Sequence, residues 1–462
     1  MGGLSRFLNK ITSSNDPSPP APAVQQQQQH FAQPAYFQQQ HGNGKRVVGY
    51  FNRGIYGPKY FPNMIPAPYL THVMYSFANV QPATGTVVLT DAWADVEIHY
   101  DGDDWNEQGT NLYGNFKALY KLKQANRNLK VMLSIGGWSY RENFKNLVNP
   151  AHRAEFARSA VSIVEDVGLD GLDIDWEYPE TQAEQQALVD LLRLCREALD
   201  DLAKRKGKPQ QHYELSIAAP CGPQVYEKLM LPELDRYLTF WNLMLRLGSL
   251  LFSPPSYPDL GHPRRTIRRH CIPTTRKAPV STERSNSTKV AESRHTRSFS
   301  VRPPGHLGTR LGGHFAYLFF SAATGIPVYG RRFQNTAGIG QRFSGVGENE
   351  GLVPYRELQV GGGQLVEDSQ MGSSYLLNPH AKELITYDSP NIAIAKAQYI
   401  NRNQLGGAMF WSLELDRRPG EDQQAPALIP LMSSQMEGGL LYSENELQYP
   451  FSKYDNLRSG RI

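Results

Sequence analysis

One acidic segment constrains this chain more than any other feature. Residues 168–179 read Gly-Leu-Asp-Gly-Leu-Asp-Ile-Asp-Trp-Glu-Tyr-Pro. In an extended strand successive side chains point to opposite faces, so Asp173, Asp175 and Glu177 share one face and the apolar residues between them share the other. Successive carboxyl groups then lie about 6–7 Å apart. The segment therefore predicts a buried strand that carries a row of acids.

Such a row cannot stay fully ionised inside a folded protein. Burial and like charge both raise a carboxyl pKa, so at least one of the three groups should hold a proton near neutral pH. A protonated acid beside an ionised carboxylate is what general acid cleavage of a glycosidic bond requires. The alternatives are an acidic cation site or a solvated strand edge. We favour catalysis because Trp176 and Pro179 end the strand abruptly at Glu177, as at a barrel rim.

Short apolar runs alternate with helical segments from Arg46 onward, a pattern typical of parallel strands joined by crossover helices. The pattern predicts an α/β fold, a (β/α)8 TIM barrel, in which catalytic groups lie at the C-terminal ends of the strands. The expected helices span 116–126, 150–167, 182–206 and 391–403. Besides the acidic strand, the expected strands span 47–51, 72–78, 130–138, 213–220, 238–244, 325–331 and 406–411.

The acidic motif, Asp-Gly-Leu-Asp-Ile-Asp-Trp-Glu at 170–177, resembles the catalytic signature of glycoside hydrolase family 18, the chitinases. Ser-Ile-Gly-Gly-Trp at 134–138 is similar to the third-strand motif of that family. The resemblance covers residues 46–244 and 326–455 and is to the fungal intracellular, class V type. It implies a small α+β insertion domain after the seventh strand, at 332–388, within a catalytic barrel over 45–435, followed by a C-terminal extension over 436–462.

The resemblance also implies roles for individual residues. Glu177 would donate a proton to the glycosidic oxygen, and the acetamido oxygen of the substrate would attack the anomeric carbon, which is a retaining, substrate-assisted mechanism. Asp175 would orient the acetamide N–H and share a proton with Asp173. No metal or organic cofactor is implied, and the substrates would be chitin and chitooligosaccharides. The implied substrate-binding residues are Tyr50, Phe77, Gly137, Trp138, Tyr178, Met244 and Trp411. From its position alone, a Trp that ends a barrel strand, such as Trp411, is more often core.

The chain departs from the family pattern after Met244. Chitinases continue with Tyr-Asp and an aromatic residue, which hold the acetamido group, whereas this chain continues with Leu245-Arg246. Residues 245–315 form an anomalous basic insert, which as a loop could bind an anionic cell-wall polymer or nucleic acid. A one-base frame shift is a second hypothesis, because CTA-CGA encodes Leu-Arg and contains TAC-GA, which begins Tyr-Asp; the nucleotide sequence tests it. Because of this departure, a chitin-binding lectin with impaired or no catalysis remains the alternative to an endo-acting chitinase.

Composition adds a few expectations. Residues 1–44 are rich in Pro and Gln, which predicts a disordered tail. The net charge of +4 arises largely from the Arg-rich stretch 264–310, so we expect no nucleic-acid partner. Cys195, Cys221 and Cys271 are widely spaced, which fits a reducing compartment.

With no signal-like or membrane-spanning segment in the sequence, we expect a monomer that is cytoplasmic or released without a signal peptide, with extracellular action as an alternative. Trp93, Tyr100 and Trp105 lie in the expected loop 91–114, where they would either pack locally or line outer sugar subsites.

Overall fold

A computed structural model describes residues 44–209, 213–244, 265–266, 321–358, 363–418 and 425–462. The predicted tail 1–44 lies outside the described residues except for Gly44. The basic insert also lies outside them, apart from Arg265–Thr266 (β8), which pairs antiparallel with Arg342–Phe343 (β11). None of the helices within the described ranges is long and apolar enough to cross a membrane.

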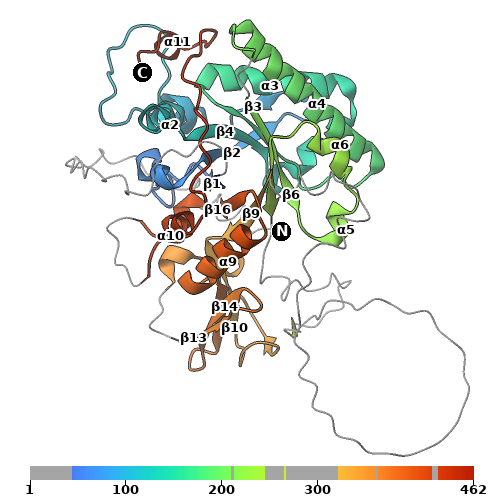
Figure 1. Cartoon of the computed structure of the whole chain (residues 1–462), viewed down its shortest axis with the longest axis vertical. Coiled ribbons are helices and arrows are strands. Elements are labelled where there is room, and N and C mark those ends of the chain that lie inside the picture. The colour runs from blue at the N-terminus through green and yellow to red at the C-terminus, as the bar shows by residue number, and fades with distance from the viewer. Residues whose placement is uncertain (1–43, 210–212, 245–264, 267–320, 359–362, 419–424) are drawn as a thin grey trace, which may run out of the picture.

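The described chain forms a closed barrel of parallel strands, which confirms the predicted (β/α)8 fold (Figure 1). The barrel closes where β1 pairs with β2 on one side and with β16 on the other. A short strand, β3 (Val87–Val88), adds antiparallel to the end of β2 and was not predicted. In the order of the sheet, the barrel strands are β1 (Arg46–Phe51), β16 (Gly407–Trp411), β9 (Ala322–Pro327), β7 (Phe240–Met244), β6 (Glu214–Pro220), β5 (Gly171–Asp175), β4 (Lys130–Gly136) and β2 (His72–Val80).

Helices cover the outside of the barrel (Figure 1). Their ends follow local sequence signals: Asn149 caps α3 and Gly168 ends it with φ +83°, while Thr181 and Glu184 form a capping box at the start of α4. The predicted helix ends agree with the structure to within two residues. The helices are α2 (Gly114–Ala125), α3 (Pro150–Val167), α4 (Gln182–Arg205), α5 (Pro223–Tyr226), α6 (Leu231–Asp235), α9 (Pro390–Arg402), α10 (Leu428–Ser434) and α11 (Asp455–Arg458).

Successive residues along each barrel strand point alternately into two hydrophobic layers, one outside the barrel and one inside it. On β1, Val47 and Phe51 belong to the core between the sheet and the helices, whereas Val48 and Tyr50 point into the barrel. The interior cluster is small and contains Met74, Met132, Phe240, Ala323 and Met409 as well, with Phe77, Met244 and Trp411 packed against it. The barrel is therefore filled by side chains, and its polar groups stand out against an apolar lining.

The predicted seventh strand, 325–331, was wrong in its limits. It joins the end of β9 to the start of β10 (Tyr329–Gln334), which belongs to a different sheet. Pro327 has no N–H to continue the barrel ladder, and the N–H of Val328 bonds instead to the carbonyl of Trp411 at 3.0 Å. The second sheet is antiparallel, lies apart from the barrel in Figure 1, and contains β12 (Leu352–Pro354), β10, β15 (Glu383–Tyr387), β14 (Ser373–Asn378) and β13 (Gln364–Asp368).

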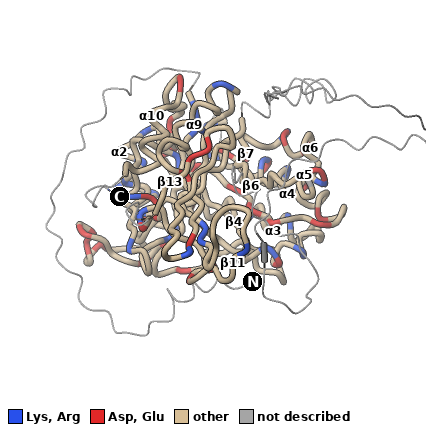
Figure 2. The backbone as a smooth tube through the Cα atoms, turned by 90° about the horizontal axis from the view of Figure 1, so that it is seen from below, with Lys and Arg blue, Asp and Glu red and all other residues tan. Residues whose placement is uncertain are grey.

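Charged residues of both signs are interspersed over the described part of the chain (Figure 2). Many form short-range pairs, such as Arg193 with Glu197 on α4 and Arg158 with Glu155 on α3. No group of three or more His, Cys, Asp or Glu residues within the described ranges could hold a metal ion.

Candidate active site

The acidic row lies on β5 and just beyond it. Asp173 and Asp175 are buried inside the barrel, while Leu172, Ile174 and Trp176 pack in the outer core. β5 ends at Asp175, so Glu177 lies two residues past the strand and is only partly buried, whereas the sequence predicted that the strand reaches Glu177. Glu177 thus occupies the C-terminal end of the barrel, where TIM barrels place their catalytic groups.

Asp173 is held by donors from four different strands. Its Oδ2 accepts hydrogen bonds from the Tyr50 hydroxyl and the Ser134 hydroxyl, both at 2.8 Å. Its Oδ1 accepts from the Ser216 hydroxyl at 2.7 Å and from the Asn242 side-chain amide at 3.2 Å. Burial raises the pKa of Asp173, and these donors act in the opposite direction because they stabilise the carboxylate.

Asp175 lies in a different environment, although it is only two residues away. Its Oδ1 is buried and accepts no hydrogen bond from the described residues. Burial, followed by the charges of Glu177 and Asp173, raises the pKa of Asp175 well above its usual value. We therefore assign a proton to Asp175 near neutral pH, with Asp173 as the carboxylate that the surrounding donors stabilise.

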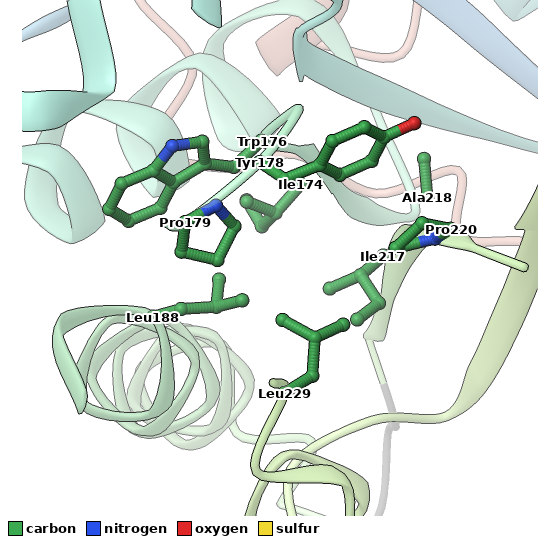
Figure 3. A pocket seen from close by; sticks show the side chains of 9 residues that line it. All are labelled: Ile174, Trp176, Tyr178, Pro179, Leu188, Ile217, Ala218, Pro220 and Leu229. Carbon is green, nitrogen blue, oxygen red and sulfur yellow. The ribbon is translucent and has the colours of Figure 1, made fainter. Parts of the chain in front are cut away.

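Glu177 accepts a hydrogen bond from the Tyr178 hydroxyl at 3.1 Å. Tyr178 also lines a small apolar pocket on the outer side of the strand ends (Figure 3). Because Ile174 and Trp176 line the same pocket, it lies on the face of β5 opposite to the carboxyl groups. The other lining residues are Pro179, Leu188, Ile217, Ala218, Pro220 and Leu229.

Three of the predicted substrate-binding residues form an aromatic cluster at the ends of neighbouring strands. The rings of Tyr50, Phe77 and Trp411 have centroids 5.3–6.4 Å apart, and those of Phe77 and Trp411 are stacked. Met244 packs against the same interior cluster. The charges of Asp173, Asp175 and Glu177 all raise the pKa of Tyr50 further above the value that burial gives it. The aromatic cluster and the acidic row are therefore one site.

Gly137 and Trp138 follow β4 at the edge of this site. Gly137 has φ +78°, and a Cβ there would lie 2.7 Å from the Phe77 ring, so only glycine permits this approach. Trp138 is 48% exposed and belongs to neither hydrophobic cluster of the barrel. The guanidinium of Arg141 lies 4.1 Å from the centre of its ring, a cation–π contact that covers one face.

Comparisons with known proteins identify the family. A model of "Glycosyl hydrolases family 18" matches residues 46–303 and 318–416. Endochitinase 1 of Metarhizium robertsii is 38% identical over 431 residues, which cover 90% of this chain and 92% of that protein. The chain belongs to glycosyl hydrolase family 18.

Solved structures place the fold within the same group of proteins. The catalytic domain of the psychrophilic chitinase B from Arthrobacter TAD20 superposes with a TM-score of 0.66 at 22% identity, covering 87% of this chain and 98% of that domain. The chitinase-like agglutinin RobpsCRA from Robinia pseudoacacia superposes with a TM-score of 0.59 at 20% identity, covering 84% and 98%. These similarities support the family 18 barrel as the fold.

Sequence reasoning missed several residues of this family 18 site. Ser134, Ser216 and Asn242 surround Asp173, because strand register places Ser134 and Ser216 directly beside it. A buried acid, Glu414, was also missed: it accepts hydrogen bonds from the Ser412 hydroxyl at 2.7 Å and the Asn52 amide at 2.9 Å. It thereby joins the loops that follow Trp411 and Tyr50. The sequence did carry one signal for these residues, because they are polar side chains at inward-facing positions of otherwise apolar strands.

Proposed function

We propose that this chain is an endo-acting chitinase, which hydrolyses β-1,4 linkages between N-acetylglucosamine units. The observation that carries the proposal is the acidic row of β5 beside the cluster of Tyr50, Phe77 and Trp411. The 38% identity to a fungal endochitinase over 90% of the chain supports it. Aromatic rings supply apolar surface for sugar faces, and the carboxyl groups supply acid catalysis.

Each of the three acids in the row would have a different role. Glu177 is partly exposed at the end of the barrel and would protonate the glycosidic oxygen. The acetamido oxygen of the substrate would attack the anomeric carbon in place of a second enzyme carboxylate, with retention of configuration. The buried Oδ1 of Asp175 accepts no bond from the described residues and would accept the acetamide N–H. Asp173 would stay in place through its four donors and balance the proton on Asp175.

A chitin-binding lectin is the second candidate. It is favoured by the sequence after Met244, which lacks the Tyr-Asp pair expected to hold the acetamido group. Loss of such positioning contacts commonly costs several orders of magnitude in rate. The similarity to a chitinase-like agglutinin is in fold alone. We favour the enzyme because Glu177 and both aspartates are present.

Hydrolysis of a fluorogenic chitooligosaccharide, measured for the wild type beside Glu177→Gln, separates the two candidates. We expect turnover by the wild type and loss of turnover in the variant, with chitooligosaccharide binding retained in both. Binding without turnover by the wild type would instead establish the lectin. Product lengths from a long soluble substrate test endo action, since internal cleavage releases a mixture of oligomers. We also expect a monomer, because one chain supplies all the residues of the candidate site. Sedimentation tests this expectation.

A further inference from the structure

Two strands that carry aromatic residues of the candidate site lose their direct pairing just before those residues. The parallel ladder between β1 and β16 ends at Gly49 and Phe410. The next residues, Tyr50 and Trp411, have ring centroids 5.3 Å apart. Past this point β1 stays paired with β2, and β16 stays paired with β9. The two rings therefore belong to strands that are tied to different neighbours, and contacts beyond the ladder set the distance between them.

Glu414 supplies such a contact. Its Oε1 accepts hydrogen bonds from the Asn52 side-chain amide at 2.9 Å and from the Ser412 hydroxyl at 2.7 Å. The Asn52 amide also donates to the Ser412 hydroxyl oxygen at 3.2 Å. Asn52 lies two residues after Tyr50, and Ser412 directly follows Trp411. Three side chains therefore form a closed set of hydrogen bonds across the two strand ends.

Two glycines on the β1 side let the chain around Glu414 approach closely. A Cβ on Gly49 would lie 2.4 Å from Cδ2 of Leu413, and a Cβ on Gly54 would lie 3.5 Å from Cβ of Glu414. The turn Leu413–Leu415 (η9) therefore packs directly onto β1 and the loop that follows it. Glu414 is only 3% exposed, so its hydrogen bonds are shielded from water.

The carboxyl group of Glu414 is bonded by uncharged groups. Burial raises its pKa, and the donors that oppose this shift are the Ser412 hydroxyl, groups of Asn52 and a backbone group of Glu414 itself. Its Oε2 is buried and has no partner among the described residues. A glutamine keeps the shape and the accepting oxygen, so it should preserve the junction. An alanine removes both hydrogen bonds.

Asp416, two residues further on, is a buried acid with different contacts. It accepts hydrogen bonds of 2.9 Å from the backbone N–H groups of Leu428 and Ile429 at the start of α10, and from that of Arg417. These bonds fix the beginning of a helix outside the barrel. Asp416 therefore offers a control from the same segment, because its loss should lower stability without moving the Trp411 ring.

We propose that Glu414 is a positioning residue of the candidate site, which holds the Trp411 ring at its distance from Tyr50. This inference rests on the proposed function, in which a sugar ring lies on this aromatic pair. The Tyr50 hydroxyl also donates the 2.8 Å hydrogen bond to Asp173, so the junction places the sugar relative to the acidic row. Moving a positioning group by about 1 Å can lower a rate about 100-fold.

The test measures affinity for chitotetraose by calorimetry in a Glu177→Gln background, which prevents turnover. We expect Glu414→Ala to weaken binding about three- to tenfold, the range of one aromatic contact, and Glu414→Gln to stay within about twofold of the parent. In a Trp411→Ala protein, Glu414→Ala should cause no further loss, because Glu414 acts through that ring. Asp416→Asn is the matched control: it should lower the melting temperature and leave the affinity unchanged.

Asn52→Ala breaks the same junction from the β1 side and should weaken binding in the same direction. It decides the question if thermal unfolding shows that Glu414→Ala does not fold. Unchanged affinity in the folded variant would overturn the positioning role. So would an equal loss in Glu414→Gln or in Asp416→Asn, or a further loss in the Trp411→Ala protein.

The proposed function fails separately, because the affinities are measured without turnover. If the wild type shows no hydrolysis but the variants give the expected affinities, the positioning role stands and the enzyme does not. Hydrolysis by the wild type together with unchanged affinities in the variants gives the reverse result.

Discussion

The two ends of this barrel both bury carboxyl groups, but the pKa of Glu214 at the N-terminal end and the pKa of Asp175 at the C-terminal end are shifted in opposite directions. At the N-terminal end, Glu214 contacts the Lys130 ammonium and lies 3.0 Å from Nε2 of His72. Burial alone would raise the pKa of Glu214, yet these neighbours hold it well below its usual value. At the C-terminal end, burial and like charge raise the pKa of Asp175, whose Oδ1 has no donor among the described residues.

The pairing at the N-terminal end extends into the C-terminal segment. Lys123 is fully buried and bonds at 2.8 Å to Asp170, to the Gly168 carbonyl and to the Tyr449 hydroxyl. Lys206 lies 3.3 Å from Glu446. The C-terminal segment, dark red in Figure 1, supplies Tyr449 and Glu446. The comparison teaches that paired charges stabilise the N-terminal end. At the C-terminal end, carboxyl groups lie close together, and the proposed chemistry uses the raised pKa that results.

The largest effect on stability is expected from Glu214→Gln. The variant leaves the Lys130 ammonium buried without its counter-charge, which should lower the free energy of unfolding by about 3–5 kcal/mol. The folded pKa of Glu214 is depressed, so its contribution is present above the unfolded pKa of about 4.3 and is lost as pH falls through the folded pKa. Denaturant unfolding at several pH values measures the difference, which should shrink below about pH 4.

Asp201→Asn is the matched control, because its partner Lys204 and Asp201 are both largely exposed. It should change stability by less than about 1 kcal/mol. Equal effects of the two substitutions would show that the N-terminal end gains nothing from its pairing. Activity of the folded Glu214→Gln protein should match the wild type, since Glu214 lies at the other end of the barrel.

Asp175→Asn should separate function from stability. We expect kcat to fall about 10²–10³-fold, as for loss of one group that positions and stabilises the reacting atoms. Because the folded pKa of Asp175 is raised, its stability contribution is full below the unfolded pKa of about 3.9 and is lost as pH rises toward the folded pKa. The variant should therefore unfold at a higher temperature than the wild type above about pH 5, and at a similar temperature near pH 3. A variant that is less stable than the wild type at neutral pH would contradict the assignment.

Ser216→Ala should have a smaller effect that is specific to the hub around Asp173. Losing one hydrogen bond to a charged group costs about 1.5–3 kcal/mol, so kcat/KM should fall by about 10- to 150-fold. Removal of a donor also raises the pKa of Asp173, and the acidic limb of the pH–rate profile should move upward. Ser159→Ala is the control, because Ser159 is a buried serine that accepts a hydrogen bond from the Val87 N–H on the outer layer. A shift of the acidic limb in both variants would mean that Ser216 has only a structural role.

The sequence predicted the C-terminal end of the barrel, which carries the acidic row, better than the N-terminal end. The acidic row and the eight strands follow from periodicity that is local in the chain. The donors to Asp173 depend on the register between strands, which places Ser134 and Ser216 level with it but leaves no local mark. Lys123 and Tyr449 are 326 residues apart, so their contact arises only in the folded barrel. The junction of β9 and β10 was missed because only one residue separates the two strands and the residues across it, 326–329, form one uninterrupted run without a charge or a glycine.

Infrared difference spectroscopy on Asp175 tests the contrast between the two ends most directly. The spectrum of the wild type minus Asp175→Asn at pH 7 should contain the carbonyl band of a protonated carboxylic acid, because burial and the charges of Glu177 and Asp173 keep the proton on this group. A difference spectrum that contains only carboxylate bands would show that Asp175 is ionised in the folded protein, and it would contradict the proposed division of roles along the row.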